Sequence, residues 1–260
     1  MATIPKVINY CWFGKNPLPD EVKECINSWK KFLPEYEIKQ WNESNFDVNC
    51  CDYVKEAYEA KKWAFVSDYA RFWVLYNYGG LYFDTDVEII KPLDHIVQSG
   101  PFLACEPTYG RKNLPPKVNP GLGMGAVSHM ELYKEVLDKY ETQHFFNEDG
   151  SINQETIVIK VTSILKKHGF QGNETIEHVA GIDIYPVEYF CPKNYITNEI
   201  NLTENTVAIH HYSASWNSNL DKMIMKLRFS PSKNDVEYYA RQIIAIPLVV
   251  LNKVWHKVRS

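Results

Sequence analysis

The chain has 260 residues, of which 45% are hydrophobic, so it can bury a substantial core as one large domain or two small ones. Its formal net charge is −4, from 28 basic and 32 acidic side chains, which argues against the broad basic surface of a nucleic-acid-binding protein. The N-terminus lacks a basic segment followed by an apolar stretch of secretory length, and the six cysteines form no C-x-x-C pair. We therefore expect free thiols and a cytoplasmic protein.

The first part of the chain predicts a strand, a helix and a second strand. Residues 6–13 (KVINYCWF) are β-branched and aromatic and end at a glycine, which is typical of a buried strand. Asp20 is the expected N-cap of a helix with apolar residues at helical spacing, which stops before Pro34. Residues 37–41 (EIKQW) alternate as the second strand, so the order is β-α-β.

A long helix and a short strand follow. Residues 53–78 are predicted as one helix, because their aromatic residues form a stripe at helical spacing and Gly79-Gly80 supplies a left-handed stop. Residues 81–83 (LYF) are the next strand. Asp84 and Asp86 stand where this strand ends.

The remainder of the chain continues to alternate between strands and helices. Strands are predicted over residues 101–105, 182–187 and 206–211, and helices over 130–140 and 155–167. Residues 108–125 form a loop rich in proline and glycine, whose length indicates function or mobility, and its NPGLGMG segment is a candidate for an acceptor-side wall or a lid. This alternation, without any linker composition, predicts an open α/β sheet, and such sheets bind ligands outside the carboxyl ends of their strands.

The paired aspartates admit several interpretations. An EF-hand loop starting at Asp84 would need a glycine where Ile89 stands and a bidentate glutamate where His95 stands, so we exclude it. A glycosidase needs two carboxyl groups about 5–9 Å apart, which two residues of one strand allow in distance, although the pair normally comes from different elements. Solvated turn residues would also explain an isolated D-x-D. A divalent metal shared with a diphosphate suits oxygen ligands of this kind.

The surrounding residues 64–94 favour the metal. Asp68 and Arg71 are three residues apart on one face of the predicted helix, and Gly79-Gly80 turns that helix back beside the strand. An Asp/Arg pair at this spacing is commonly a surface ion pair. Beside a D-x-D strand end, however, it offers an acceptor for ribose or sugar hydroxyls and a guanidinium for phosphate or sugar oxygens.

This segment resembles glycosyltransferase family 32, a DXD-containing group that includes bacterial capsule and surface-polysaccharide enzymes, and more distantly the large clostridial glucosylating toxins. The likeness spans most of residues 4–216, with SDYARFWVLYNYGGLYFDTDVEIIKPLD as the family signature and AIHHYSASW as its closing motif. The resemblance implies a GT-A-type, Rossmann-like α/β fold, with a mixed sheet flanked by helices. It would form a single domain over residues 1–233 with a C-terminal amphipathic helical extension over 234–260.

The resemblance also implies a role for each matching residue. Asp86 would be the direct ligand of Mn²⁺ or Mg²⁺, and Asp84 would contact ribose or metal-bound groups. His210 or His211 would complete the metal shell, and both stay candidates because strand alternation sends them to opposite sides, with His210 preferred. Catalysis is expected from Asp84, Asp86 and Arg71. The other implied contacts are with the donor: Trp12 on the base, Asp68 and Arg71 on the sugar, Tyr82 along the donor site, and Ser215 and Trp216 on the diphosphate.

The implied function is metal-dependent transfer, with retention of configuration, from a nucleotide-sugar donor, expected to be UDP-linked. The acceptor would be a glycan or a lipid-linked oligosaccharide in capsule or surface-polysaccharide synthesis. A glycoside hydrolase and a noncatalytic sugar- or nucleotide-binding module are the alternatives.

The C-terminal residues 240–259 combine an apolar run with basic and aromatic residues. The run is too short for the roughly 20 residues that span a bilayer, and Pro247 interrupts it. An interfacial helix at the inner face of the plasma membrane and a terminal helix packed on the domain are both open.

Overall fold

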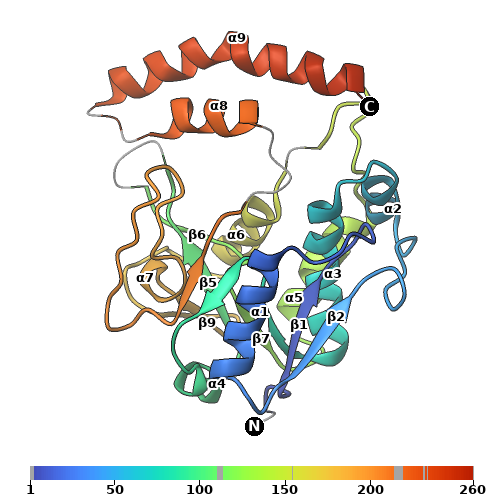
Figure 1. The fold of residues 1–260 in the computed structure, drawn as a ribbon, viewed down its shortest axis with the longest axis vertical. Helices are drawn as coiled ribbons and strands as arrows, with labels where there is room; N and C mark the ends of the chain where they lie inside the picture. Colours follow the sequence, from blue (N-terminus) through green and yellow to red (C-terminus); the bar gives the residue numbers. More distant parts are fainter. Residues whose placement is uncertain are drawn as a thin grey trace.

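A computed structural model describes residues 3–109, 114–153, 155–213, 219–230, 232 and 234–259. In these residues an eight-stranded mixed sheet has the order β2-β1-β3-β7-β5-β9-β8, with β6 paired to β5, and a second sheet pairs β10 with β4 (Figure 1). The strands are β1 Val7–Cys11, β2 Glu37–Trp41, β3 Gly80–Tyr82, β4 Val87–Ile89, β5 Phe102–Glu106, β6 Lys117–Val118, β7 Met124–Ala126, β8 Glu177–Val179, β9 Ile182–Tyr185 and β10 Ala208–His210.

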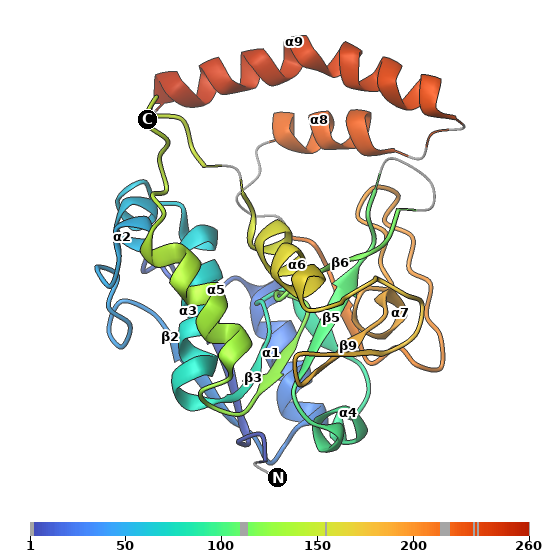
Figure 2. The ribbon, with the colours of Figure 1, turned by 180° about the vertical axis from the view of Figure 1, so that it is seen from behind.

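Helices cover both faces of the large sheet. In Figures 1 and 2, α1 lies on one face, and α3, α5 and α6 lie on the other. The helices are α1 Asp20–Phe32, α2 Asp52–Glu59, α3 Trp63–Tyr78, α4 Asp94–Ser99, α5 Glu131–Glu141, α6 Ile157–Lys167, α7 Val187–Phe190, α8 Asn219–Phe229 and α9 Asp235–Arg259.

Each face of the sheet has its own hydrophobic core, because successive strand side chains point to opposite faces. Leu81 and Phe83 join the core on the α1 side, whereas Tyr82 between them joins the core on the α3 side. The result is three layers, helix–sheet–helix, as the α/β pattern predicts. The expected α/β class, with a mixed sheet flanked by helices, is confirmed.

The N-terminal β-α-β unit is also confirmed. Strand β1 lies between β2 and β3 and is parallel to both, with Ile8 opposite Ile38 and Leu81. Buried Asn9 ties these strands together, since its Nδ2 donates to the carbonyl of Leu81 (3.1 Å) and its Oδ1 accepts from Nε1 of Trp41 (2.8 Å). The carboxyl ends of β1 and β3 therefore meet at one edge of the sheet.

Two local predictions are wrong. The helix expected over residues 53–78 is two helices, α2 and α3, and Lys61 between them takes a left-handed conformation with φ of 56°. The aromatic stripe that predicted the helix lies wholly within α3, so it did not reveal where α2 ends. Asp20 is the first residue of α1 rather than its cap; Pro19 occupies the N-cap position and makes no side-chain hydrogen bond.

The proline- and glycine-rich loop contains more structure than predicted. Strands β6 and β7 lie within residues 108–126, and the turn at residues 119–122 joins them. Strands of two or three residues are too short to show a period of their own. Their pairing with β5 and β3 creates them, which is a tertiary effect.

Helices α8 and α9 are the last two helices of the chain and lie at one end of the molecule (Figure 1). Helix α9 runs alongside α8, which separates it from the sheet in both views. Among the described residues, no helix has both the length and the apolar character of a bilayer-crossing segment. The boundary between residues 233 and 234 stays a prediction.

Candidate metal centre

The two aspartates lie in the short connection between β3 and β4. Strand β3 ends at Tyr82 and β4 begins at Val87, so Asp84 and Asp86 occupy the turn at the carboxyl end of β3. The N–H of Val87 donates to the carbonyl of Asp84 (3.1 Å), which closes the turn. This is the sheet edge at which the α/β topology predicts ligand binding.

Asp84 points to the α3 side of the sheet. Its Oδ1 is 3.1 Å from Nη2 of Arg71 and accepts a hydrogen bond from the hydroxyl of Tyr82 at 3.0 Å. The same guanidinium nitrogen is 3.1 Å from Oδ1 of Asp68, one turn earlier on α3. Arg71 is almost fully buried, so it is a buried cation shared by two carboxylates rather than a surface ion pair.

This burial changes the protonation of Asp68. Desolvation raises the pKa of Asp68 to about 6, with the neighbouring Asp84 acting in the same direction and Arg71 opposing it. Because a pKa of about 6 is still below 7, most of the Asp68 side chain is ionised at neutral pH and accepts hydrogen bonds beside a fixed guanidinium. This combination can bind hydroxyl groups and anionic oxygens together.

Asp86 has different partners. Its Oδ1 is 3.1 Å from Nε2 of His210 on β10, and its Oδ2 accepts from the N–H of Ser213 at 2.9 Å. Burial by itself would raise the pKa of Asp86, but His210 and the N–H of Ser213 reverse this and hold it at about 2. Asp86 is consequently ionised throughout the physiological range, as a metal ligand must be.

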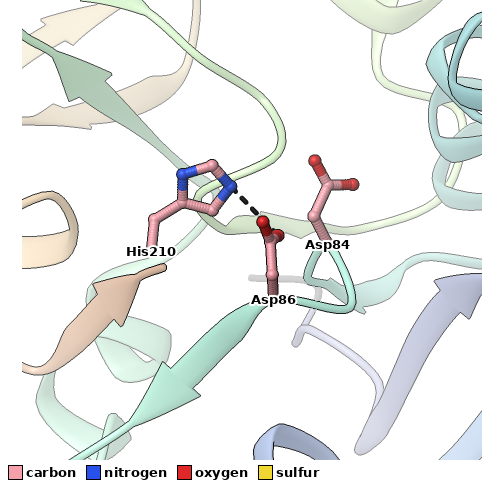
Figure 3. Close-up of side chains that lie close together, drawn as sticks. All are labelled: Asp84, Asp86 and His210. Carbon is pink, nitrogen blue, oxygen red and sulfur yellow. Dashed lines mark ion pairs between the residues drawn. The ribbon is translucent and has the colours of Figure 1, made fainter. Parts of the chain in front are cut away.

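Asp84, Asp86 and His210 together form a candidate metal site. Each residue offers one ligand atom, and these atoms all lie within 4.8 Å of one another (Figure 3). Two carboxylates and one imidazole suit a hard or borderline divalent ion such as Mn²⁺. Nδ1 of His210 is buried and has no hydrogen-bond partner in the described part of the chain, so the carboxylate of Asp86 is the main polar contact of this ring. The donor set fits the expected cofactor.

The second histidine of the pair lies elsewhere. Nε2 of His211 is 2.8 Å from Oε2 of Glu88, on the opposite side of β10 from His210. Strand alternation, which left the choice open in the sequence, thus brings His210 and not His211 into the cluster with Asp84 and Asp86. We leave His211 out of the ligand set proposed below.

Trp12 directly follows β1 at the same sheet edge, and its partly buried indole donates from Nε1 to the carbonyl of Asn16 at 2.7 Å. Ser215 and Trp216 lie outside the described residues. Their expected contacts with a diphosphate stay predictions.

One functional candidate, Glu106, escaped the sequence interpretation, whereas Asn119 and Gly121 were expected at the acceptor side or in a lid and not beside Asp84. The carbonyl of Gly121 accepts from the N–H of Asp84 at 3.0 Å, and the side chain of Asn119 links this turn to Glu106. The position of Glu106 in the sequence could have identified it. Glu106 ends β5, and acidic residues at strand ends of an open sheet are candidate site residues.

The candidate metal site thus lies at a strand end of the mixed α/β sheet, beside the buried pair of Asp68 and Arg71. Residues 19–103 match the family model described as "Glycosyltransferase sugar-binding region containing DXD motif". Over residues 19–103, this match confirms the resemblance to a DXD-containing glycosyltransferase that the sequence suggested.

Two curated relatives from Schizosaccharomyces pombe (strain 972 / ATCC 24843) match the chain. Inositol phosphoceramide mannosyltransferase 1 is 28% identical over 114 residues, covering 40% of this chain and 34% of the relative. Inositol phosphoceramide mannosyltransferase 3 is 31% identical over 100 residues, covering 37% of this chain and 28% of the relative. The matches thus span about a third of the length of these relatives.

Solved structures of glycosyltransferases also align with the chain. The galactosyltransferase LgtC in complex with donor and acceptor sugar analogs is 10% identical with a TM-score of 0.46, covering 90% of this chain and 99% of that one. The PaToxG glycosyltransferase is 18% identical with a TM-score of 0.44, covering 63% and 69%.

Proposed function

We propose that the protein is a metal-dependent, retaining glycosyltransferase that moves a sugar from a nucleoside-diphosphate donor to a glycan or lipid-linked acceptor. The observation that carries this proposal is the cluster of Asp84, Asp86 and His210, whose ligand atoms lie within 4.8 Å of one another beside the Arg71 guanidinium. A DXD-family sequence supports the same function independently.

The residues of the site divide the work of binding. Asp86, His210 and Asp84 would hold a divalent ion, which would supply positive charge against the diphosphate that departs as the glycosidic bond breaks. Asp68 would accept hydrogen bonds from donor hydroxyls, and Arg71 would donate to sugar or phosphate oxygens. Because Arg71 is already fixed by two carboxylates, it needs little reorganisation when the donor binds.

Neither aspartate of the D-x-D motif is suited to act as the acid catalyst of a glycoside hydrolase. A hydrolase needs one carboxylic acid that is protonated near neutral pH to protonate the leaving group. The pKa of Asp86 is about 2, because His210 and the N–H of Ser213 outweigh the effect of burial, so Asp86 cannot supply that proton. Oδ1 of Asp84 is engaged by Arg71 and Tyr82.

Calorimetric titration with Mn²⁺ and UDP tests the transferase proposal. We expect UDP to bind in the presence of Mn²⁺, to bind much more weakly in EDTA, and to lose its metal-dependent affinity in Asp86→Ala. Glu88→Ala is the matched control, because Glu88 lies two residues further on and pairs with His211 instead. Equal UDP binding with and without metal would contradict the proposal, and turnover of no activated sugar would favour a binding module.

The identity of the donor is open to a direct screen. UDP-linked sugars are our first expectation, and the names of the curated relatives add nucleotide-activated mannose and a phosphoinositol-containing sphingolipid acceptor to the compounds worth testing. Metal-dependent release of the nucleoside diphosphate identifies the donor. The anomeric configuration of the product, observed by NMR, then tests retention. A role in capsule or surface-polysaccharide synthesis would follow from the acceptor that is used.

We also propose that α9 brings the enzyme to the cytoplasmic surface of a membrane that carries its acceptor. Several apolar side chains of this helix are exposed, including Ile243 (66%) and Ile244 (61%). The sequence has no acidic residue after Glu237, while it has Lys253, Lys257 and Arg259 near its end. An apolar surface combined with positive charge suits an interfacial helix on anionic lipid.

Vesicle flotation tests this role of α9. The full chain should float with vesicles of phosphatidylcholine and phosphatidylglycerol, and less with phosphatidylcholine alone. Deletion of residues 234–260 should abolish flotation, and the double variant Lys253→Glu/Lys257→Glu should weaken it on anionic vesicles. Unchanged membrane recovery after the deletion would refute the membrane role.

A further inference from the structure

The turn at residues 119–122, far from the DXD motif in the sequence, packs against Asp84. The carbonyl of Gly121 accepts from the N–H of Asp84 at 3.0 Å. The Cα of Gly121 also faces the carboxylate, because a Cβ built there would lie 2.0 Å from Oδ2 of Asp84 and 2.9 Å from its Cγ. The absence of a side chain at Gly121 therefore leaves the space in which this carboxylate lies, and any side chain there would displace it.

Asn119 holds the turn at residues 119–122 in place. Its Oδ1 accepts from the N–H of Gly121 at 2.8 Å, and its own N–H donates to the carbonyl of Ala104 on β5 at 2.9 Å. Its Nδ2 donates to Oε2 of Glu106 at 2.7 Å. The side-chain amide thus uses its oxygen on the turn and its nitrogen on the last residue of β5.

These contacts form a continuous path from Glu106 through Asn119 and Gly121 to Asp84. Each step is a hydrogen bond of 3.0 Å or less. On the other side of Asp84, Arg71 and Tyr82 fix Oδ1. The aspartate is therefore held from two directions, and only the Arg71 direction belongs to the sequence motif.

We propose that Glu106 is a positioning residue of the metal centre, which acts through Asn119 and Gly121 to hold Asp84 in register with Asp86 and His210. The inference rests on the proposed function, since it assumes that these three residues bind a divalent ion. The hydrogen bond accepted by Glu106 keeps the Asn119 amide in the orientation that presents its oxygen to the turn. Without it, the amide can rotate and the turn loses its anchor on β5.

The test is the affinity for Mn²⁺ alone, measured by electron paramagnetic resonance of the free ion. Glu106→Ala should weaken Mn²⁺ binding about tenfold, the lower end of the range for outer-shell partners of metal ligands. Glu106→Gln should stay close to wild type, because its amide oxygen can still accept from Asn119. Glu56→Ala is the matched control: Glu56 also holds a loop, accepting from the N–H of Phe145 at 2.9 Å, and it should leave Mn²⁺ affinity unchanged.

A reciprocal exchange separates positioning from a general loss of stability. Asn119→Asp places two carboxylates together and should weaken Mn²⁺ binding as much as Glu106→Ala. The double variant Glu106→Gln/Asn119→Asp restores a donor and an acceptor with reversed direction, so it should recover most of the affinity. Thermal unfolding without metal, recorded for every variant, identifies any variant that fails to fold. Among the folded variants, the comparison of Asn119→Asp with the double variant Glu106→Gln/Asn119→Asp then decides whether Glu106 acts by positioning.

Two results would overturn this inference. One is wild-type Mn²⁺ affinity in folded Glu106→Ala, and the other is failure of the double variant to recover what Asn119→Asp loses. In both cases the proposed function would still stand, provided that the unsubstituted chain binds Mn²⁺. A wild-type chain that binds no Mn²⁺ would overturn the proposed function and this inference together.

Discussion

At the residue scale, the two aspartates of one short motif are held in different ways. Asp84 lies between a guanidinium and a phenol, whereas Asp86 lies between an imidazole and a backbone N–H. Carboxylates are costly to bury without a partner, and here each has its own set of donors. Neither depends on the other for charge compensation.

Removal of the Arg71 guanidinium should strongly destabilise the fold. Arg71→Met leaves Asp68 and Asp84 without the cation that separates them, so we expect a loss of about 3 kcal/mol in the free energy of unfolding. Urea denaturation followed by circular dichroism measures it. Lys23→Met, which breaks the exposed pair with Asp20, should leave the stability almost unchanged. Equal effects of the two substitutions would contradict the buried-pair account.

Cys51 should be the most reactive thiol at neutral pH among the described residues. It is the N-cap of α2, and the neighbouring Cys50, followed by the N–H groups of Val54 and Tyr53, lowers its pKa. A lower pKa means more thiolate at pH 7, so alkylation by iodoacetamide should have its pH midpoint below that of free cysteine. Mass spectrometry after partial labelling locates the site.

Cys50→Ala and Cys51→Ser distinguish the two thiols. Cys51→Ser should remove the fast phase of alkylation, and Cys50→Ala should shift its midpoint upward because the donor to the Cys51 thiolate is lost. A fast phase that survives Cys51→Ser would show that the reactive thiol has been misassigned.

At the element scale, α1 fixes the strand that leaves the DXD turn. Trp29 is fully buried in this helix, and its Nε1 donates to the carbonyl of Val87, the first residue of β4, at 2.7 Å. Its ring also packs against Tyr10 and Phe83 from β1 and the end of β3. One side chain thus joins both sides of the turn that carries Asp84 and Asp86.

Trp29→Phe should therefore destabilise the protein by about 2 kcal/mol, through lost volume and an unsatisfied carbonyl at Val87. Urea denaturation measures the change. Trp12→Phe serves as the control, because the indole of Trp12 is only partly buried and donates to an exposed loop carbonyl. Comparable losses in the two variants would argue against a special role for the Val87 contact.

At the scale of the whole molecule, the C-terminal extension should be separable from the metal centre. Helix α9 packs mainly on α8, and the contacts described above for Asp84, Asp86 and His210 all come from residues that precede α8. A chain ending at residue 233 should keep the thermal unfolding midpoint and the Mn²⁺ affinity of the full chain. Differential scanning calorimetry and Mn²⁺ titration check this, and loss of metal affinity on truncation would show that α9 supports the site.

The sequence by itself determined the α/β class and the place of the site. A β-branched and aromatic run marked β1, alternation marked β2, the helical stripe marked α1, and the D-x-D after LYF marked the strand end at which Asp84 and Asp86 lie. These features are local: each is encoded within a few residues, where period 2 or period 3.6 decides which side chains face the core. The resemblance carried by residues 64–94 indicated Asp84 and Asp86 as residues of the metal centre, and the closing motif AIHHYSASW indicated a histidine.

The tertiary structure decided everything that depends on residues far apart in the chain. The partner of Asp86 is His210 rather than His211 because antiparallel pairing of β4 with β10 sets the register, and His211 meets Glu88 from 123 positions away. The support of Asp84 by Gly121 arises because β7 pairs with β3, which brings the turn at residues 119–122 to the sheet edge. No periodicity within a segment encodes such contacts, because they result from how segments pack and not from the pattern inside any one of them.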